Sequence, residues 1–239
     1  MTLYDRIGTT YESTRSTDPR IAARIWAALG EALTVVNVGA GTGHYEPADR
    51  EVVAVEPSEV MIASRPPGSA PVVRAHAEAL PFADGAFDAA MAVLSDHHWR
   101  NRAGGLRELR RVGRRVVVFN FDVAAVGTFW LDDYLPEWVE LAHSGMGIEE
   151  IGAHLGGARI EPVAIPCDCR DGFLGAYWAR PEAYLDPAVR ANISVFAKID
   201  AAEGIARLAE DLRSGAWHAR HNHLLALGEL DLGYRLLVA

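Results

Sequence analysis

The 239-residue chain has few of the features that would mark a secreted or membrane-spanning protein. Its only two cysteines, Cys167 and Cys169, lie too close together to build a disulfide framework, and they suit a reducing compartment. No apolar run reaches the roughly 18 residues of a membrane span. The first residues are polar and lack the apolar core of a signal peptide. We therefore expect a cytoplasmic protein without a membrane anchor.

Basic charge is also scarce. Lysine and arginine total 23 against 32 acidic residues, which gives a formal net charge of −9. An acidic chain without a basic stripe is a poor partner for nucleic acid or for an anionic membrane surface, so a small-molecule partner is expected. Lys198 is the sole lysine, and we attribute the excess of arginine to codon usage in a GC-rich genome rather than to chemistry. The sequence does not indicate the oligomeric state.

The sequence also lacks a metal-binding signature. Cys167 and Cys169 have no second cysteine pair to complete a zinc site. His218, His221 and His223 cluster near the C-terminus, but no carboxylate or cysteine completes a ligand set around them. We expect no metal.

What the sequence does contain is an alternation of short apolar runs and helical patterns, which is typical of a parallel sheet covered by helices. The runs expected to be strands are residues 33–38, 51–56, 71–74, 87–94 and 116–121. Asp18-Pro19 can begin a helix on which Ile21, Ile25 and Leu29 share a face, and Gly30 can end it. Ser58 can cap a second helix. Leu106, Leu109 and Val112 mark a third.

The pattern changes after Asp122. Residues 123–157 and 167–227 are aromatic and irregular, with a helix expected near 201–213, and residues 159–166 can form a sixth strand. The closing residues, 228–239, contain a last strand that we expect to be antiparallel at or near the sheet edge. We predict one domain over 1–239: an N-terminal arm and ligand-binding core over 1–122, mostly a substrate cap over 123–227, and the final strand. The fold class is α/β, a doubly wound, mostly parallel seven-stranded sheet.

A glycine-rich loop directly follows the first apolar run. Gly39, Ala40, Gly41, Thr42 and Gly43 allow a tight turn and a close approach of backbone to a ligand. The alternative interpretation is a turn with no ligand. The spacing G-x-G-x-G differs from the G-x-G-x-x-G of dinucleotide sites, which disfavours a pyrophosphate and favours an adenosine without phosphates.

Two further features support an adenosine site. Glu56 ends the second apolar run, where a carboxylate can accept hydrogen bonds from both hydroxyls of a ribose, unless it is only a solvated charge at a strand end. Ala77 and Glu78 follow the third run, where they can meet an adenine edge.

Four segments, NVGAGTG, AVEPSEVM, AEALPFADGAFDAAMAVLSDHHW and GLRELRRVGRRVVVFNFD, resemble the class I S-adenosylmethionine (SAM)-dependent methyltransferases of the menaquinone-biosynthesis-like group, also called methyltransferase type 11. The resemblance covers about residues 1–122. It implies a Rossmann-like methyltransferase fold and SAM as cofactor. Two positions depart from the group: Asn37 stands where many members carry aspartate, and Asp96 where an aliphatic residue is common.

The resemblance also implies which residues bind SAM. They are the glycine loop, which contacts the methionine part, a carboxylate that binds the ribose, residues that contact the adenine, and an N-terminal arm that closes over the site. By number they are Gly39, Ala40, Gly41 and Gly43; Glu56; Pro57 and Met61 beside the adenosine; Ala77 and Glu78; Ser95 on the methionyl side; and Tyr11 and Arg15 of the arm.

Catalytic residues are harder to identify. Methyl transfer needs an aligned nucleophile and sometimes a base, and reacting groups gather at the carboxyl ends of parallel strands. His97 and His98 lie there as candidate bases, although both can equally be structural. Aromatic residues of the cap, Trp130 and Tyr177 among them, are candidates for the acceptor pocket as well as for the cap core. Two rivals stay open: a non-catalytic SAM-binding protein and a nicotinamide-dependent oxidoreductase.

Overall fold

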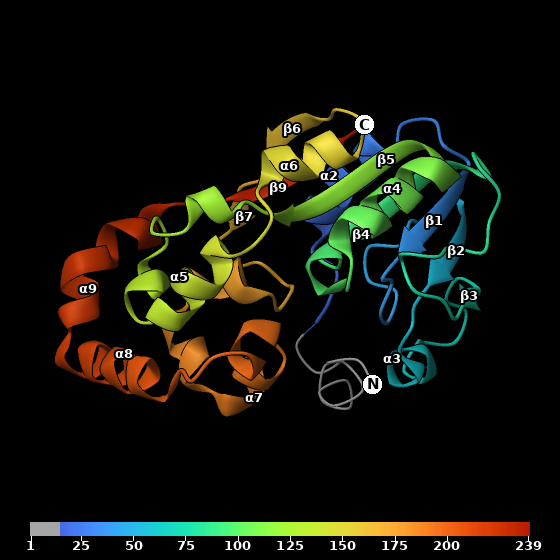
Figure 1. Ribbon diagram of the computed structural model, residues 1–239. Coiled ribbons are helices and arrows are strands. Elements are labelled where there is room, and N and C mark those ends of the chain that lie inside the picture. Colours follow the sequence, from blue (N-terminus) through green and yellow to red (C-terminus); the bar gives the residue numbers. More distant parts are fainter. Residues whose placement is uncertain (1–14) are drawn as a thin grey trace.

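The computed structural model describes residues 15–239, which are built around a seven-stranded sheet with the order β3-β2-β1-β4-β5-β9-β6. The strands of this sheet are β1 (Thr34–Val38), β2 (Glu51–Val55), β3 (Val72–Val73), β4 (Phe87–Val93), β5 (Gly113–Phe121), β6 (Arg159–Pro162) and β9 (Tyr234–Val238). Strands β1 to β5 run parallel, and β9 lies antiparallel between β5 and β6 (Figure 1). The predicted fold class, with its antiparallel last strand near the edge, is confirmed.

The central strands are apolar on both faces because helices cover both. Side chains alternate along a strand, so Val35 and Val117 belong to one buried layer while Val36 and Val116 belong to the other. This burial on both sides explains the near-continuous valine runs in the sequence.

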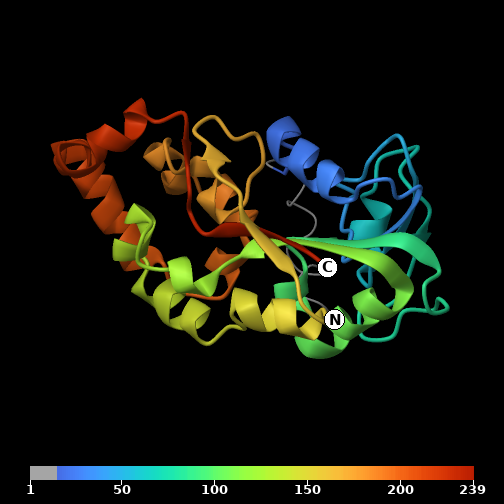
Figure 2. The same cartoon turned by 90° about the horizontal axis from the view of Figure 1, so that it is seen from above.

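Helices pack on the two faces of the sheet, as the view from above shows (Figure 2). On one face lies α2 (Pro19–Ala28), which is capped by the Asp18 side chain. On the other face lie α4 (Arg102–Val112) and α6 (Ile148–His154). The short α3 (Glu59–Ala63) follows β2 and is capped by Ser58, as its sequence predicts.

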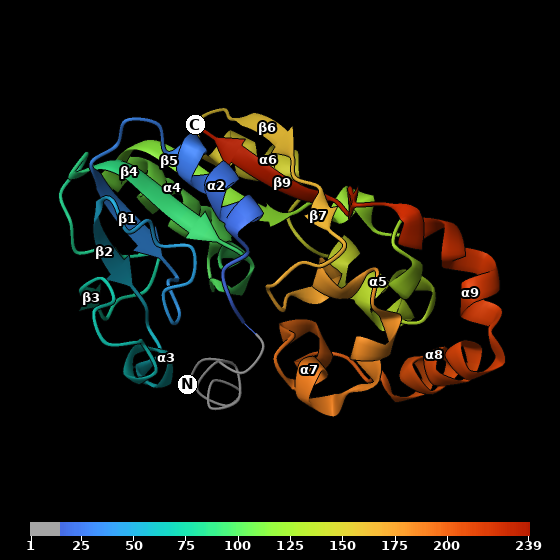
Figure 3. The ribbon, with the colours of Figure 1, turned by 180° about the vertical axis from the view of Figure 1, so that it is seen from behind.

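The cap is a helical body beside the sheet (Figures 1 and 3). It contains α5 (Pro136–His143), α7 (Pro187–Ala191), α8 (Ala202–Ser214), α9 (Ala216–His221) and a small sheet of β7 (Ile165–Pro166) and β8 (Glu229–Leu230). The 3-10 turns of the described chain are η2 (Asp96–His98), η3 (Val123–Ala125), η4 (Trp130–Asp133), η5 (Leu174–Tyr177), η6 (Pro181–Leu185), η7 (Ser194–Ala197) and η8 (Asn222–Ala226). Trp130, Trp178, Tyr184 and Trp217 are buried in the cap interior, in an apolar cluster that continues to α2 and one face of the main sheet.

Two boundaries differ from the sequence prediction. Residues 148–154 were expected in the cap, but they form α6, whose apolar side packs with α4 in the layer against the sheet. Residues 159–166 were expected as one strand. They divide at Val163 into β6 in the main sheet and β7 in the cap, because Val163 still donates to Tyr234 while Cys167 already pairs with Gly228.

Candidate active site

The glycine loop between β1 and β2 adopts a backbone conformation that residues other than glycine rarely adopt. Gly39 and Gly41 have φ angles of 71° and 53°, in the left-handed region that favours glycine. A Cβ at position 39 would lie 2.6 Å from Cβ of Ser95, and one at position 41 would lie 3.1 Å from Cε of Met61. The loop therefore needs glycine both for its turn and for the space beside it.

A cavity of about 370 Å³ opens over this loop, at the carboxyl ends of β1, β2 and β4. We call it the first cavity. The predicted cofactor residues that line it are Arg15, Gly39, Ala40, Gly41, Glu56, Pro57, Met61, Ala77, Glu78 and Ser95. Gly43 belongs to the loop but not to the lining, and Tyr11 lies outside the described residues. Ten of the positions chosen from separate sequence segments therefore meet around one cavity.

Glu56 is fixed in this cavity by backbone donors. Its side-chain oxygens accept hydrogen bonds from the backbone N–H of Gly41 and of Ser58, each at 2.9 Å. The residue is only 5% exposed. Each carboxylate oxygen can accept more than one hydrogen bond, so a ligand hydroxyl can still bind. Burial rules out the alternative of a solvated strand-end charge.

Three other predicted positions have defined partners. Ser95 lines the first cavity, and its hydroxyl donates to the carbonyl of Val38 at 2.9 Å, which ties the end of β4 to the end of β1. The Glu78 carboxylate accepts from the backbone N–H of Asn101. Asn37 is buried behind the loop and does not line the cavity; its amide donates to Glu46 at 3.1 Å.

A second cavity of about 410 Å³ lies between the end of β5 and the cap. Its apolar wall includes Phe121, Trp138, Phe173 and Tyr234. Five residues line both cavities: Arg15, Leu94, His97, His98 and Lys198. The two spaces therefore adjoin along a common wall formed by these five residues, three of which, Leu94, His97 and His98, follow directly after β4.

The histidine pair forms part of this common wall. The His97 and His98 rings lie with centroids 3.9 Å apart in the turn η2. Desolvation by the surrounding protein atoms lowers the pKa of His98 to about 3. Desolvation, followed by the charges of His98 and Lys198, lowers the pKa of His97 well below its ordinary value, although the His97 side chain stays accessible from the cavities. Both rings are therefore neutral at pH 7, which is the form that can accept a proton.

Leu94, two residues before the turn η2, is held in an unusual backbone conformation. Leu94 has a φ of 49°, and its N–H donates to the carbonyl of Phe119 at 2.8 Å. A bulky residue rarely occupies this region, and such outliers gather at functional sites. Together with Asp96, which is fully buried between Arg102 (2.7 Å) and the amide of Asn120 (2.7 Å), this bond fixes where the histidines project.

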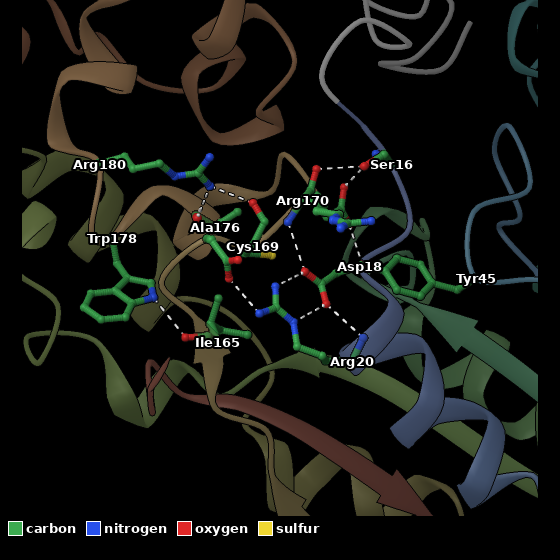
Figure 4. Close-up of polar contacts among 12 residues, drawn as sticks. Ser16, Asp18, Arg20, Tyr45, Ile165, Cys169, Arg170, Ala176, Trp178 and Arg180 are labelled. Atoms are coloured by element: carbon green, nitrogen blue, oxygen red, sulfur yellow. Dashed lines mark hydrogen bonds and ion pairs between the residues drawn. The ribbon is translucent and has the colours of Figure 1, made fainter. Parts of the chain in front are cut away.

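The N-terminal segment is fastened to the cap by contacts that the sequence did not indicate. Arg15 pairs with the buried Asp171 at 2.6 Å, and the hydroxyl of Tyr45 donates to the same carboxylate at 2.9 Å. Beside this pair, the Asp18 carboxylate lies between Arg20 and the backbone N–H of Arg170 (Figure 4). These contacts hold the first-cavity residues Arg15 and Tyr45 against the cap turn at 167–171.

The cap aromatics divide into two groups. Trp130 and Tyr177, candidates for the acceptor pocket, line neither cavity. The indole N–H of Trp130 donates to the carbonyl of Trp178 at 2.8 Å inside the cap core, and the Tyr177 ring packs against Tyr184. Both rings therefore pack in the cap core, the alternative that the sequence left open, and not in the lining of either cavity. Trp138 and Phe173 line the second cavity instead.

Within residues 15–239, no group of three or more His, Cys, Asp or Glu side chains is arranged to hold a metal ion. Both cysteines are free thiols. In the same part of the chain, no helix has the length and apolar character needed to cross a membrane.

Two comparisons match parts of the chain. Residues 36–119 match a family model described as a methyltransferase domain. A curated relative, the uncharacterised protein YafE of Escherichia coli (strain K12), is 44% identical over 48 residues, which cover 19% of this chain and only 23% of YafE.

One solved structure extends the likeness over 95% of the chain. A putative methyltransferase from an antibiotic biosynthesis pathway of Anabaena variabilis ATCC 29413 is 31% identical, with a TM-score of 0.88 over 95% of this chain and 99% of that one. Two more distant structures share the fold. A Thermotoga maritima SAM-dependent methyltransferase, possibly a histamine N-methyltransferase, is 22% identical with a TM-score of 0.54 over 67% of this chain and 84% of that one. The [4+2]-cyclase SpnF is 16% identical with a TM-score of 0.58 over 99% and 92%.

Proposed function

The chain belongs to the class I SAM-dependent methyltransferases, and we propose that it transfers the methyl group of SAM to an O, N or C nucleophile of a small-molecule metabolite. The observation that carries this proposal is the pair of adjoining cavities with a common wall. A displacement at a methyl carbon needs donor and acceptor in line and in contact. Two spaces that meet at Leu94, His97 and His98 provide that arrangement.

The residues of the first cavity fit SAM. Gly41 keeps a space that a Cβ would fill, and the buried Glu56 carboxylate is held toward the cavity. In this proposal the glycine loop and Ser95 bind the methionyl part, Glu56 accepts from the ribose hydroxyls, and residues around Met61 and Ala77 pack against the adenosine. SAM supplies an electrophilic methyl group there. The described residues orient it and keep water from the reacting carbon.

The second cavity fits the acceptor. Its volume of about 410 Å³ lies within the range of roughly 300–1,000 Å³ that small-molecule pockets occupy. A net charge of −9 argues against a nucleic-acid acceptor. The Anabaena variabilis relative, described as part of an antibiotic biosynthesis pathway, supports a small and specialised metabolite. Neutral His97 lies where it can take a proton from a hydroxyl or amine nucleophile.

The division between core and cap also follows from this arrangement. We assign cofactor binding to residues before 123, whereas the cap supplies Trp138, Phe173, residues 192–195 and Lys198 to the second cavity. We propose that acceptor specificity depends on these cap residues.

The proposal is tested by incubating the protein with methyl-labelled SAM and a low-molecular-mass extract. Label should move into a small product, and Trp138→Ala should slow this transfer while SAM affinity changes only a few-fold. Leu225→Ala, on the exposed cap surface, serves as the control. Label recovered in nucleic acid or protein instead, or a Trp138 variant that loses SAM and spares the acceptor, would contradict the proposal.

A further inference from the structure

The charges around the second cavity are unlike those of the protein as a whole. The chain carries a net charge of −9, yet the described residues that line this cavity include Arg15, Arg102 and Lys198 and no aspartate or glutamate. An acceptor that enters the cavity therefore meets cations and apolar side chains.

Two of the three cations are already neutralised. Arg15 pairs with Asp171 at 2.6 Å, and Arg102 pairs with Asp96 at 2.7 Å. Both carboxylates are buried behind the arginines. These ion pairs orient the guanidinium groups and leave little net positive charge for a ligand.

Lys198 is different. Its backbone N–H donates to the carbonyl of Val195, but among residues 15–239 its ammonium group has no ion-pair or hydrogen-bond partner, and the side chain lines both cavities. It follows the turn η7 and is accessible from the cavities. Desolvation lowers its pKa, which is the direction expected when no anion faces the ammonium group. No role was predicted for this lysine from the sequence.

The position of Lys198 also matters for the reaction. A sulfonium bound in the first cavity brings a second positive charge to the common wall, and like charges repel. A negative group on the acceptor would lie beside the ammonium and relieve this repulsion. The apolar wall formed by Phe121, Trp138 and Phe173 would hold the rest of the acceptor.

We propose that the acceptor is an apolar or aromatic molecule that carries a carboxylate, or an equivalent anionic group, and that Lys198 binds this group. The inference rests on the proposed function, because it assigns the second cavity to the acceptor. The methionyl carboxylate of the cofactor has the same chemistry, so the experiment must separate the two sources.

The test uses protein saturated with S-adenosylhomocysteine and three pairs of probes that differ mainly in charge: benzoate and benzamide, 2-naphthoate and 2-naphthamide, indole-3-acetate and indole-3-acetamide. Calorimetry should show at least one acid binding about tenfold or more tightly than its amide, as expected for a hydrogen bond to a charged group. Lys198→Met should remove this preference and Lys198→Arg should keep most of it. Arg213→Met, which removes a cation with 74% side-chain exposure on α8, should leave it unchanged.

The affinity for S-adenosylhomocysteine separates the remaining outcomes. This affinity should change by no more than about threefold in Lys198→Met, because a larger loss would mean that the lysine binds the cofactor and not the acceptor. A large loss of S-adenosylhomocysteine affinity in this variant, no preference for any acid in the wild-type protein, or a preference that survives Lys198→Met would each overturn the inference. If the wild-type protein fails to bind S-adenosylhomocysteine at all, the proposed function itself is wrong.

Discussion

Replacing Glu56 with glutamine tests the cofactor site most directly. The change keeps the shape of the side chain and one acceptor oxygen, but it removes the charge and turns the other oxygen into an N–H donor. In the protein both oxygens accept backbone hydrogen bonds, from Gly41 and Ser58. In Glu56→Gln the new amide NH₂ therefore faces one of these backbone N–H donors, with which it cannot form a hydrogen bond. The uncharged amide oxygen is also a weaker acceptor for the ribose hydroxyls.

Two effects of measurable size follow. Hydrogen bonds to a charged group contribute about 1.5–3 kcal/mol, so S-adenosylhomocysteine should bind about 10- to 150-fold more weakly. The unliganded protein should also lose about 1–3 kcal/mol of unfolding free energy, because one buried backbone N–H is left without an acceptor. From the sequence alone Glu56 is a strand-end carboxylate whose removal leaves the fold unchanged, so the loss of stability is a prediction of the structure.

Calorimetric titration with S-adenosylhomocysteine and urea unfolding of the free protein measure the two effects separately. The matched control is Glu59→Gln, which removes the same charge three residues further along the chain. The Glu59 side chain is 71% exposed and pairs with Arg74. This control should leave affinity and stability unchanged. Unaltered affinity in Glu56→Gln, or an equal loss in Glu59→Gln, would refute the assignment of Glu56 to the ribose.

Three further changes probe the loop, the cap contact and the base. Gly41→Val should abolish SAM binding and keep most secondary structure by circular dichroism, because φ is 53° and the space is needed; retained binding would show that the loop is only a turn. Asp171→Asn should cost about 3 kcal/mol in urea unfolding by leaving Arg15 without its buried partner, and no loss would contradict that role. If His97 accepts the acceptor's proton, His97→Ala should lower kcat by about 10²–10⁴-fold. Because the pKa of His97 is lowered, wild-type activity should be constant from pH 8 to about 6.5 and should fall only as the pH drops through that pKa. The variant should lack this acidic fall in activity, and near-full activity of the variant would exclude His97 as the base.

The parts of the site that depend on local sequence could be predicted. The glycine loop follows a strand that is buried on both faces, so both its position and its spacing are visible in the chain. Glu56 follows β2 for the same reason. In a parallel sheet the carboxyl ends of neighbouring strands lie at one edge, which is why residues chosen one strand at a time meet around one cavity.

The parts that depend on the meeting of distant segments could not be predicted. Arg15 and Asp171 are 156 residues apart, and nothing near either one indicates its partner. Trp130 and Trp138 are both aromatic residues at the start of the cap, yet one packs among other rings and the other lines a cavity. Composition does not distinguish them, because core and pocket are built from the same apolar side chains. Lys198 and His97 line the same wall, yet most of the cap sequence separates them along the chain.

The common wall between the cavities connects these two kinds of feature. It begins at Leu94, where the chain leaves β4 with a φ of 49°, a conformation that costs a bulky residue of order 1–2 kcal/mol. The bond from Leu94 to Phe119 on the neighbouring strand β5 holds it there, and the buried Asp96 fixes the following turn. A relaxed backbone would continue β4 in its strand direction and carry the histidines away from the cap. The strained backbone at Leu94 therefore positions His97 where the first cavity meets the second. The hydrogen bonds of the sheet offset the free-energy cost of this strain.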